Sequence, residues 1–576
     1  MASDPQRSME STPDFSSSQI TTEIREQPPQ NEKLYAQGHT GRTNISPKYK
    51  DIISRSIKIQ PGSPAVYQFR PKKEEFGSLT KITVGEKNAS KTNKTILLVG
   101  ETGAGKSTLI NALFNYSMGV KWEDEVWFQI VEEEENNQTE SQTSDVIVYE
   151  IFGFEDKTLP YSLTVIDTPG YGDTGVTEHD DMICHRLMDL FKSDDGVHEV
   201  HAVGLVMKAS INRLSDRQTY VFDSVMSLFG KDMEKNIIAL ITHSDGITPK
   251  NPLKAIEAAK IKCAKNEKDQ PVHFLFDNKQ KEERTEEYVS FFECAWKITE
   301  KGMKGFTTFL EKSAPQNMMK SVKVMKQRIR LTASIQNLKE RIERDELKKT
   351  EIRQIQEALM KYNEEMTKNE EFTVEVDEVY KVKEDIDAGM RLMVFYKAAT
   401  CCTVCEENCH YPGCTVTWKP KHCEVMKDGR CTVCTNKCPA SVHVKEKRRY
   451  VTKTRKIQKT REEMKEKFDK NKSESENMLN LLENLKREKN QLTAEIDQCL
   501  DESYKHFVQL DQIALKAGSV STYIHLDFLI EKIIEKRDTE KVQKLEEMRS
   551  RVDERTRLGL RYMLGKIPGT GKLLKK

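Results

Sequence analysis

A chain of 576 residues is long for one compact core, and 37% hydrophobic with 32% charged residues fits a globular domain joined to exposed helices. The net charge of +1 gives no overall reason to expect nucleic acid or an acidic surface as a partner. The first residues, MASDPQRSME, lack the apolar core of a signal peptide, and no run of about eighteen apolar residues predicts a membrane span, so we expect a soluble, cytoplasmic protein.

The first half of the chain divides by composition into a tail, a linker and a folded domain. Residues 1–50 are rich in Ser, Gln, Thr and Pro, which predicts a disordered tail, and 51–90 is interpreted as a linker. From 91 to 312, short β-branched runs alternate with helical stretches, which is typical of a three-layer α/β domain with a mostly parallel sheet. Strands are expected at 95–99, 146–151, 163–167, 203–207, 237–241 and 272–276, and helices at 106–116 and 215–228.

The second half is predicted to be a long antiparallel helical hairpin. Segments 313–370 and 461–500 place apolar residues at heptad spacing, which predicts a coiled coil. Ser313 is the expected cap of the first helix, with Pro315 in its first turn. The heptad positions include Leu331, Ile335 and Leu338 in the first segment and Leu492, Ile496 and Cys499 in the second.

A cysteine-rich module, 371–460, separates these two helices and is expected at the far end of the hairpin. The runs 372–382 and 443–451 alternate polar and apolar residues, so they could pair as strands at the base of the module. Residues 501–576 are predicted to form further helices and a basic tail. That tail favours at most a weak membrane-surface contact.

Residues 100–107, GETGAGKS, form a complete phosphate-binding loop between a predicted strand and a predicted helix. Glycines let the backbone wrap around phosphates, Lys106 can reach the β- and γ-phosphates, and the Ser107 hydroxyl can bind Mg²⁺. The alternative, a chance glycine turn, does not explain the strand–loop–helix context. The predicted nucleotide-binding residues of this segment are Gly100, Thr102, Gly103, Ala104, Gly105, Lys106, Ser107 and Thr108.

A second motif, DTPG, ends the buried strand 163–167. Asp167 can hold Mg²⁺ through water and Gly170 can offer its N–H to the γ-phosphate. A threonine must also sense Mg²⁺ and the γ-phosphate, and Thr143 stands at a suitable distance before the strand 146–151, with Thr139 in reserve. A polar loop with no role in nucleotide binding is the alternative for this threonine segment.

The sequence THSD follows the strand 237–241 and is predicted to select the base. The Asp245 carboxylate can accept two hydrogen bonds from guanine, whereas adenine offers no such pair of donors, so GTP is favoured over ATP. Thr242 and His243 complete the motif, and His243 could stack on the base. Asn278 could also contact the base or could be a plain turn residue.

The set GETGAGKST, IDTPG and THSD resembles septin-like P-loop GTPases, which include septins, immunity-associated GTPases of the AIG1 type and chloroplast import-receptor GTPases. A vertebrate group that joins such a G domain to a coiled coil and a Cys-rich insert is especially similar. The resemblance implies a Ras-like sheet and a dimer or oligomer formed across the nucleotide face, and it covers the remainder of the chain only loosely.

The chain departs from Ras-type proteins at the water-positioning residue. Tyr171 and Gly172 follow Gly170 where a glutamine is usual, so hydrolysis of GTP to GDP and phosphate should be slow without a partner. Arg213 and Arg217 could complete a partner's site, although a surface salt bridge is the simpler use of an arginine.

The chain has 13 cysteines, and nine of them lie between Cys401 and Cys438, where the motif CTVC occurs twice. Paired CxxC motifs strongly indicate zinc and favour up to two structural Zn²⁺ ions. The sequence does not say which four residues would bind each ion. The alternative to zinc binding is a set of buried free thiols. Cys401 is the cysteine that a zinc site would need least, and His422 lies nearby as a further possible ligand. The spacing of the cysteines does not fit a RING domain. The predicted metal ligands are Cys402, Cys405, Cys409, His410, Cys414, Cys423, Cys431, Cys434, Cys438 and His443.

Three functions compete at this point. The first is a slow GTPase that assembles under nucleotide control and binds an unknown protein through a zinc-tipped helical arm. The second is a zinc-dependent scaffold or nucleic-acid-binding protein with a structural G domain, motivated by the basic run 445–459, for which a solvated strand is the simpler interpretation. The third, an ATPase, is disfavoured by Asp245.

Overall fold

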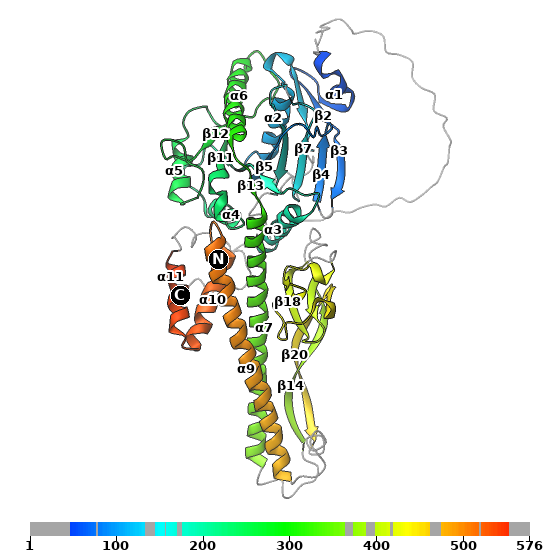
Figure 1. Cartoon of the computed structure of the whole chain (residues 1–576), viewed down its shortest axis with the longest axis vertical. Coiled ribbons are helices and arrows are strands. Elements are labelled where there is room, and N and C mark those ends of the chain that lie inside the picture. Colours follow the sequence, from blue (N-terminus) through cyan, green and yellow to red (C-terminus); the bar gives the residue numbers. More distant parts are fainter. Residues whose placement is uncertain are drawn as a thin grey trace, which may run out of the picture. The chain divides into compact units, whose positions relative to one another are not determined.

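The computed structural model describes residues 47–76, 79–132, 145–155, 157–169, 176–362, 373–386, 398–414, 419–460, 474–517 and 520–551. Its main sheet has eight strands: β3 (Lys72–Phe76), β4 (Leu79–Val84), β5 (Asn93–Gly100), β7 (Ile147–Ile151), β8 (Ser162–Asp167), β10 (Ala202–Lys208), β11 (Ile237–Thr242) and β12 (His273–Leu275). The strand order is β12-β11-β10-β5-β8-β7-β4-β3, and neighbours are parallel except for the pairs β7–β8 and β3–β4 (Figure 1). All six predicted strands are therefore present in a mostly parallel sheet.

Helices cover both faces of this sheet, which makes the three predicted layers. They are α2 (Lys106–Met118), α3 (Val176–Lys192), α4 (Asp216–Met226), α5 (Lys250–Ala258) and α6 (Val289–Lys312). Successive residues of a strand point to opposite faces. Accordingly, Ile96 and Leu98 of β5 lie in a core with α2 and α6, whereas Leu97 and Val99 lie in a core with α3, α4 and α5.

The segment 51–90 is not a linker, and that prediction was wrong. It contains most of α1 (Lys50–Ser54), then β1 (Ser56–Gln60) and β2 (Ala65–Phe69), before β3 and β4. β4 pairs with β7 and extends the main sheet, and β1 and β2 form a smaller sheet with β6 (Val126–Gln129). The edge strand β3, KKEEF, is highly charged, which is how proteins protect sheet edges and why its sequence looks like a linker.

The connection between the G-domain layers and the long helix α7 (Met319–Tyr362) also differs from the prediction. Ser313 follows the last turn of α6 and does not cap a new helix. The next residues form β13 (Gln316–Asn317), which pairs with β9 (Glu199–Val200), so α7 begins only at Met319. The first turns of α7 pack into the core that contains α3 and α4. The residues that do so are Val322, Met325 and Ile329, together with Met318 just before the helix.

The second long helix, α9 (Glu474–Ile513), lies beside α7 (Figure 1). Residue numbers rise along α7 as they fall along α9, so the two helices are antiparallel. Their side-chain contacts are Gln327 with Gln509 at 3.0 Å, Ser334 with Ser503 at 2.9 Å and Arg341 with Glu495 at 3.8 Å. Their shared core contains the predicted heptad residues Leu331, Ile335, Leu338, Leu492, Ile496 and Cys499.

Two shorter helices, α10 (Val520–Glu535) and α11 (Thr539–Ser550), follow α9. Arg328 of α7 connects them to the G domain. Its guanidinium donates to the carbonyl oxygens of Ser227, which follows α4, and Lys516, and to the hydroxyl of Thr522 in α10. The C-terminal helices are therefore fastened to the same end of α7 as the G domain.

The cysteine-rich module consists of short strands and one long ribbon. β15 (Ala398–Cys402) pairs with β16 (Glu407–Cys414) and β19 (His443–Glu446), and β17 (Met426–Lys427) pairs with β18 (Arg430–Cys431). The ribbon pairs β14 (Thr373–Asp385) with β20 (Arg448–Thr460). The predicted partner of 372–382 is 443–451. In the structure, 443–446 form β19 and pair with β15 among the short strands, and only 448–451, in β20, pair with β14.

The module does not lie at the far end of the hairpin. Arg330, near the start of α7, donates from Nε to the carbonyl oxygen of Glu424 at 2.9 Å, and the rings of His185 in α3 and His410 are stacked with centroids 5.7 Å apart. Farther along α7, Gln354 exchanges hydrogen bonds with Asp377 of the ribbon. The predicted zinc-tipped arm is therefore wrong in its geometry, because the cysteines lie at the G-domain end.

A buried ion pair joins the module to α7, and we expect Glu407→Ala to lower the free energy of unfolding by about 3–5 kcal/mol. Arg341 and Glu407 side chains are 5% and 7% exposed, with Nη2 and Oε2 3.1 Å apart. Removing the carboxylate leaves a buried guanidinium with less compensation. Urea unfolding followed by circular dichroism measures the change. The control Glu357→Ala breaks the exposed pair with Arg353 and should cost under about 0.5 kcal/mol; equal losses would contradict the prediction.

Candidate nucleotide site and cysteine module

The loop after β5 has the backbone conformation of a phosphate cradle. Gly103 and Gly105 have φ values of 73° and 94°, and a Cβ at Gly100 would lie 2.5 Å from the carbonyl oxygen of Val206. These three positions therefore require glycine. Lys106 begins α2 and is 7% exposed, and its Nζ donates to the carbonyl oxygens of Gly100 at 3.0 Å and Glu101 at 3.4 Å. The ammonium group of Lys106 is therefore held against the loop by hydrogen bonds.

The predicted nucleotide-binding segments meet at one edge of the sheet. In the parallel register, Leu98 lies opposite Asp167, Gly100 faces Val206, and Lys208 lies beside Thr242. The carboxyl ends of these strands are where open α/β sheets bind ligands. Asp167 is fully buried, and the Thr168 hydroxyl donates to the carbonyl oxygen of Leu98 at 2.9 Å, which fixes the turn.

These placements suit a nucleotide with its magnesium ion. Ser107, half-buried in the first turn of α2, and Asp167, at the end of the adjacent strand β8, are the residues that would hold Mg²⁺. Thr102 and Thr108 are half-buried on the same loop and helix turn, and Ala104 is buried. Thr143, Thr139 and Gly170 lie outside the described residues, so their predicted roles stay predictions.

The base-recognition loop is hydrogen-bonded to the phosphate loop. The Thr242 hydroxyl donates to the carbonyl oxygen of Ala104 at 2.7 Å, and His243 has a φ of 52° that turns the chain sharply. Asp245 is exposed, and its Oδ1 accepts from the N–H of Ile247 at 2.9 Å. Partial burial, followed by the charge of Lys208, lowers the pKa of His243. A neutral ring can lie against an uncharged base.

Asn278 reaches the same place from the neighbouring strand. The Ser244 N–H donates to the carbonyl oxygen of Phe276 at 3.0 Å, which brings the loops after β11 and β12 together. Asn278 Oδ1 accepts from the Thr299 hydroxyl at 3.3 Å, while its buried Nδ2 has no hydrogen-bond partner among the described residues. Buried donors are nearly always paired. An acceptor on a bound base would satisfy this one, which favours the base-contact interpretation over a plain turn.

Sequence reasoning missed the polar side chains that support the phosphate loop. Glu101 accepts from Gln218 Nε2 at 3.1 Å, and Arg217 Nε lies 3.3 Å from its Oε1. Arg217 therefore forms the salt bridge considered for it, within its own chain. Thr299 supports the base loop by accepting from the Asp277 N–H at 3.0 Å. Gln218 and Thr299 belong to no motif, so the sequence gives no signal for them.

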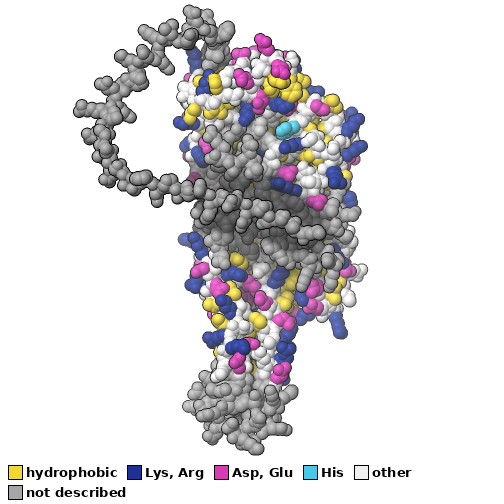
Figure 2. All heavy atoms as spheres, turned by 180° about the vertical axis from the view of Figure 1, so that it is seen from behind, with side chains coloured by type: hydrophobic (Ala, Val, Ile, Leu, Met, Phe, Trp, Pro, Cys, Tyr) yellow, Lys and Arg dark blue, Asp and Glu magenta, His cyan; other side chains and the backbone are white. Residues whose placement is uncertain are grey.

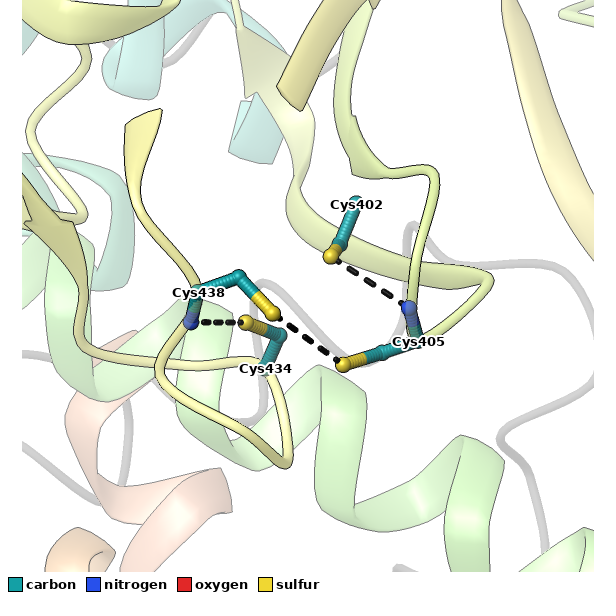
Figure 3. Close-up of side chains that lie close together, drawn as sticks. All are labelled: Cys402, Cys405, Cys434 and Cys438. Atoms are coloured by element: carbon teal, nitrogen blue, oxygen red, sulfur yellow. Dashed lines mark hydrogen bonds between the residues drawn. The ribbon is translucent and has the colours of Figure 1, made fainter. Parts of the chain in front are cut away.

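The predicted metal ligands of the module lie in three groups. In each group, one ligand atom from every residue lies within 4.8 Å of the others. Figure 3 shows the first group, in which Cys405 of the first CxxC loop approaches Cys438, which follows the second. Cys401 lies outside the groups, with its Sγ 3.4 Å from Asn408 Oδ1. The groups are Cys402, Cys405, Cys434 and Cys438; Cys409, Cys431, Cys434 and His443; and His410, Cys414 and Cys423.

Within the described residues, no helix is both long and apolar enough to cross a membrane. The basic tail beyond residue 551 lies outside the described residues, so its predicted contact with a membrane surface stays a prediction.

Comparison with known proteins gives the family of the nucleotide-binding domain. Residues 94–295 match the model of the AIG1 family. Over 80 residues the chain is 39% identical to septin-2 of Bos taurus, which covers 14% of this chain and 19% of septin-2.

Two solved structures match part of the chain at low similarity. Toc33 from Arabidopsis thaliana, solved with Mg²⁺ and GMPPNP, is 17% identical with a TM-score of 0.26, covering 39% of this chain and 88% of Toc33. Elongation factor SelB from Methanococcus maripaludis is 14% identical with a TM-score of 0.22, covering 39% of this chain and 35% of SelB. The family match and the motifs around Lys106 and Asp245 show that residues 94–295 form a septin-like G domain of the AIG1 type.

Proposed function

We propose that the protein is a slow GTPase that binds GTP or GDP with Mg²⁺ and uses the nucleotide to control its own assembly. The observation that carries this proposal is the hydrogen bond from Thr242 to Ala104, which connects the base-selecting loop directly to the phosphate loop. Lys106 and the loop N–H groups would bind phosphates, Asp245 and Asn278 would bind guanine, and Mg²⁺ would neutralise phosphate charge.

Slow turnover follows from the residues after the DTPG motif. Tyr171 and Gly172 stand where a water-positioning glutamine is usual, and neither side chain can orient an attacking water as an amide does. Hydrolysis would then depend on Thr143 and on groups supplied by a second molecule. Zinc would stabilise the cysteine module, and such reduced thiolates suit the cytoplasm, where we place the protein.

Exposed apolar side chains near the loops after β11 and β12, here called the apolar patch, support assembly through this face. Ile247, Tyr288 and Phe291 are 68%, 50% and 51% exposed. Phe291 belongs to the nucleotide end of the domain, because Lys279 Nζ lies 4.1 Å from its ring centroid and 3.4 Å from Asp277. We propose that a second copy of the chain covers this patch in the GTP-bound state.

Sedimentation of the purified chain tests this proposal, and we expect a monomer mass with GDP and a doubled mass with a non-hydrolysable GTP analogue. Phe291→Ser should remain monomeric with either nucleotide, because a hydroxymethyl group loses the apolar contact, while its nucleotide affinity stays within about twofold of wild type. The matched control Met319→Ser changes an exposed apolar residue outside this patch, and it should leave the doubled mass with the GTP analogue unchanged. One mass under all conditions would remove assembly from the proposal.

The nucleic-acid alternative has less support from the structure. The basic run 445–459 lies mostly in β20, where it faces the acidic strand β14. Lysine and arginine side chains are intermixed with aspartate and glutamate on the visible face (Figure 2). The cross-strand ion pairs are Arg448–Asp385, Lys453–Glu384, Arg455–Glu378 and Lys456–Glu375. The protein partner proposed for the helical hairpin would have to bind its outer face, because the heptad residues are already buried between α7 and α9.

A further inference from the structure

We propose that the cysteine module holds three zinc ions and that two of them share the thiolate of Cys434. The inference rests on the zinc binding proposed above and adds the number of ions and their ligands. Cys434 belongs both to the group with Cys402, Cys405 and Cys438 and to the group with Cys409, Cys431 and His443.

The number of ligands fits a bridged pair. A structural zinc ion takes four ligands, so two ions need eight coordination positions. The two groups together contain seven residues, and these fill all eight positions if Cys434 serves both ions. Without a bridge, one of the two ions would be left with three protein ligands in a buried site.

The spacing of the sulfurs also fits. Zinc–sulfur bonds of about 2.3 Å in a tetrahedron place neighbouring sulfurs about 3.8 Å apart. The Sγ atoms of Cys405 and Cys438 are 3.7 Å apart, although Cys405 belongs to the first CxxC loop and Cys438 follows the second (Figure 3). Each loop also directs a backbone N–H at a sulfur, from Cys405 to Cys402 at 3.4 Å and from Cys434 to Cys431 at 3.4 Å. Such N–H groups favour the thiolate form that binds metal.

His443 supplies separate evidence for a metal ion in the second group. Its Nδ1 lies 2.9 Å from the carbonyl oxygen of Pro439, so Nδ1 carries the hydrogen and Nε2 is left as the metal-binding nitrogen. The residue is 4% exposed, and among the described residues Nε2 has no hydrogen-bond partner. A buried nitrogen acceptor without a donor, grouped with three cysteines, is the arrangement of a metal ligand.

The third ion would lie at the contact with the G domain. His410 Nδ1 is 3.2 Å from Cys423 Sγ, Thr400 Oγ1 is 3.0 Å from Cys414 Sγ, and all three ligands are buried. These three residues make up the whole third group, so the fourth position would go to a ligand outside it; the Glu424 carboxylate, with Oε2 3.8 Å from His410 Nδ1, lies beside the group. Because His410 is stacked on His185 of α3, this ion would fix the part of the module that touches the G domain.

Elemental analysis of the purified full chain tests the number of ions. We expect three zinc ions per wild-type chain and two in Cys414→Ser, which removes one ligand of the third site. Cys401→Ser is the matched control, because this buried cysteine lies outside all three groups, and it should keep three ions. Two ions in wild type would overturn the proposal.

Replacing zinc by the NMR-active cadmium isotope tests the bridge on the wild-type chain, so the result does not depend on any variant folding. We expect three cadmium signals, of which two are split by coupling to each other through the shared sulfur. Three unsplit signals would overturn the bridge and leave zinc binding intact. A folded chain that contains no metal would overturn both the bridge and the zinc part of the proposed function.

Discussion

Lys106→Ala is expected to weaken GTP binding at least about a hundredfold. A hydrogen bond to a charged group contributes about 1.5–3 kcal/mol, and the ammonium group would contact two phosphates, so the loss is about 3–6 kcal/mol. The lysine is buried against the loop that it serves, so no neighbouring cation can take its place without rearrangement. Titration calorimetry with GTP and GDP in the presence of magnesium measures the affinity.

The control for this change is Lys254→Ala, which removes an exposed lysine from α5 and should leave the affinity unchanged. Circular dichroism and thermal unfolding must show that the Lys106 variant is folded, because its Nζ also contacts the carbonyl oxygens of Gly100 and Glu101. A folded Lys106→Ala protein that binds GTP like wild type would show that the phosphates bind elsewhere.

Asp245→Asn is expected to abolish the preference for guanine over adenine. The carboxylate accepts from two donors of guanine, whereas an asparagine side chain offers one acceptor and places an N–H against the guanine amino group. Losing one hydrogen bond and the charge behind the other, and setting an N–H against the guanine amino group, should weaken GTP binding about 10²-fold or more, with ATP binding changed much less. Xanthosine triphosphate has a carbonyl where guanine has the amino group, so it should bind the variant better than GTP does.

Competition among the three nucleotides for a fluorescent GTP analogue measures these ratios. Asp269→Asn makes the same chemical change at an exposed turn that is remote in sequence from the site, and it should leave every ratio unchanged. Equal affinity of the wild-type chain for ATP and GTP would contradict guanine recognition. An unchanged ratio in Asp245→Asn would assign base selection to another residue, with Asn278 as the next candidate.

The nucleotide loop could be predicted from the sequence because its chemistry is local. Gly103, Gly105 and Lys106 act within a few residues of one another, and the strand before them is marked by its own apolar run. The ten metal ligands were named by the same kind of local spacing. Their division into three groups could not be predicted, because it depends on how the two CxxC loops face each other.

Contacts between distant segments account for what the sequence could not predict. The position of the cysteine module depends on Arg330 with Glu424 and on His185 with His410, and none of these pairs leaves a periodic pattern. β3 and β4, at 72–84, were mistaken for part of a linker because β3 is a charged and exposed edge strand. Support of the phosphate loop by Gln218 likewise spans more than a hundred residues.

Because the first turns of α7 pack into the core of the G domain, a rotation of that core would move the far end of the helix. Its 44 residues extend about 66 Å at about 1.5 Å per residue. Because Val322 and Met325 share one core with α3, any tilt of that core would be passed to α7. A tilt of about 5° at the pivot would displace the opposite tip by about 6 Å over this length. Small rearrangements beside the phosphates would thus become large displacements at a distance where another molecule could sense them.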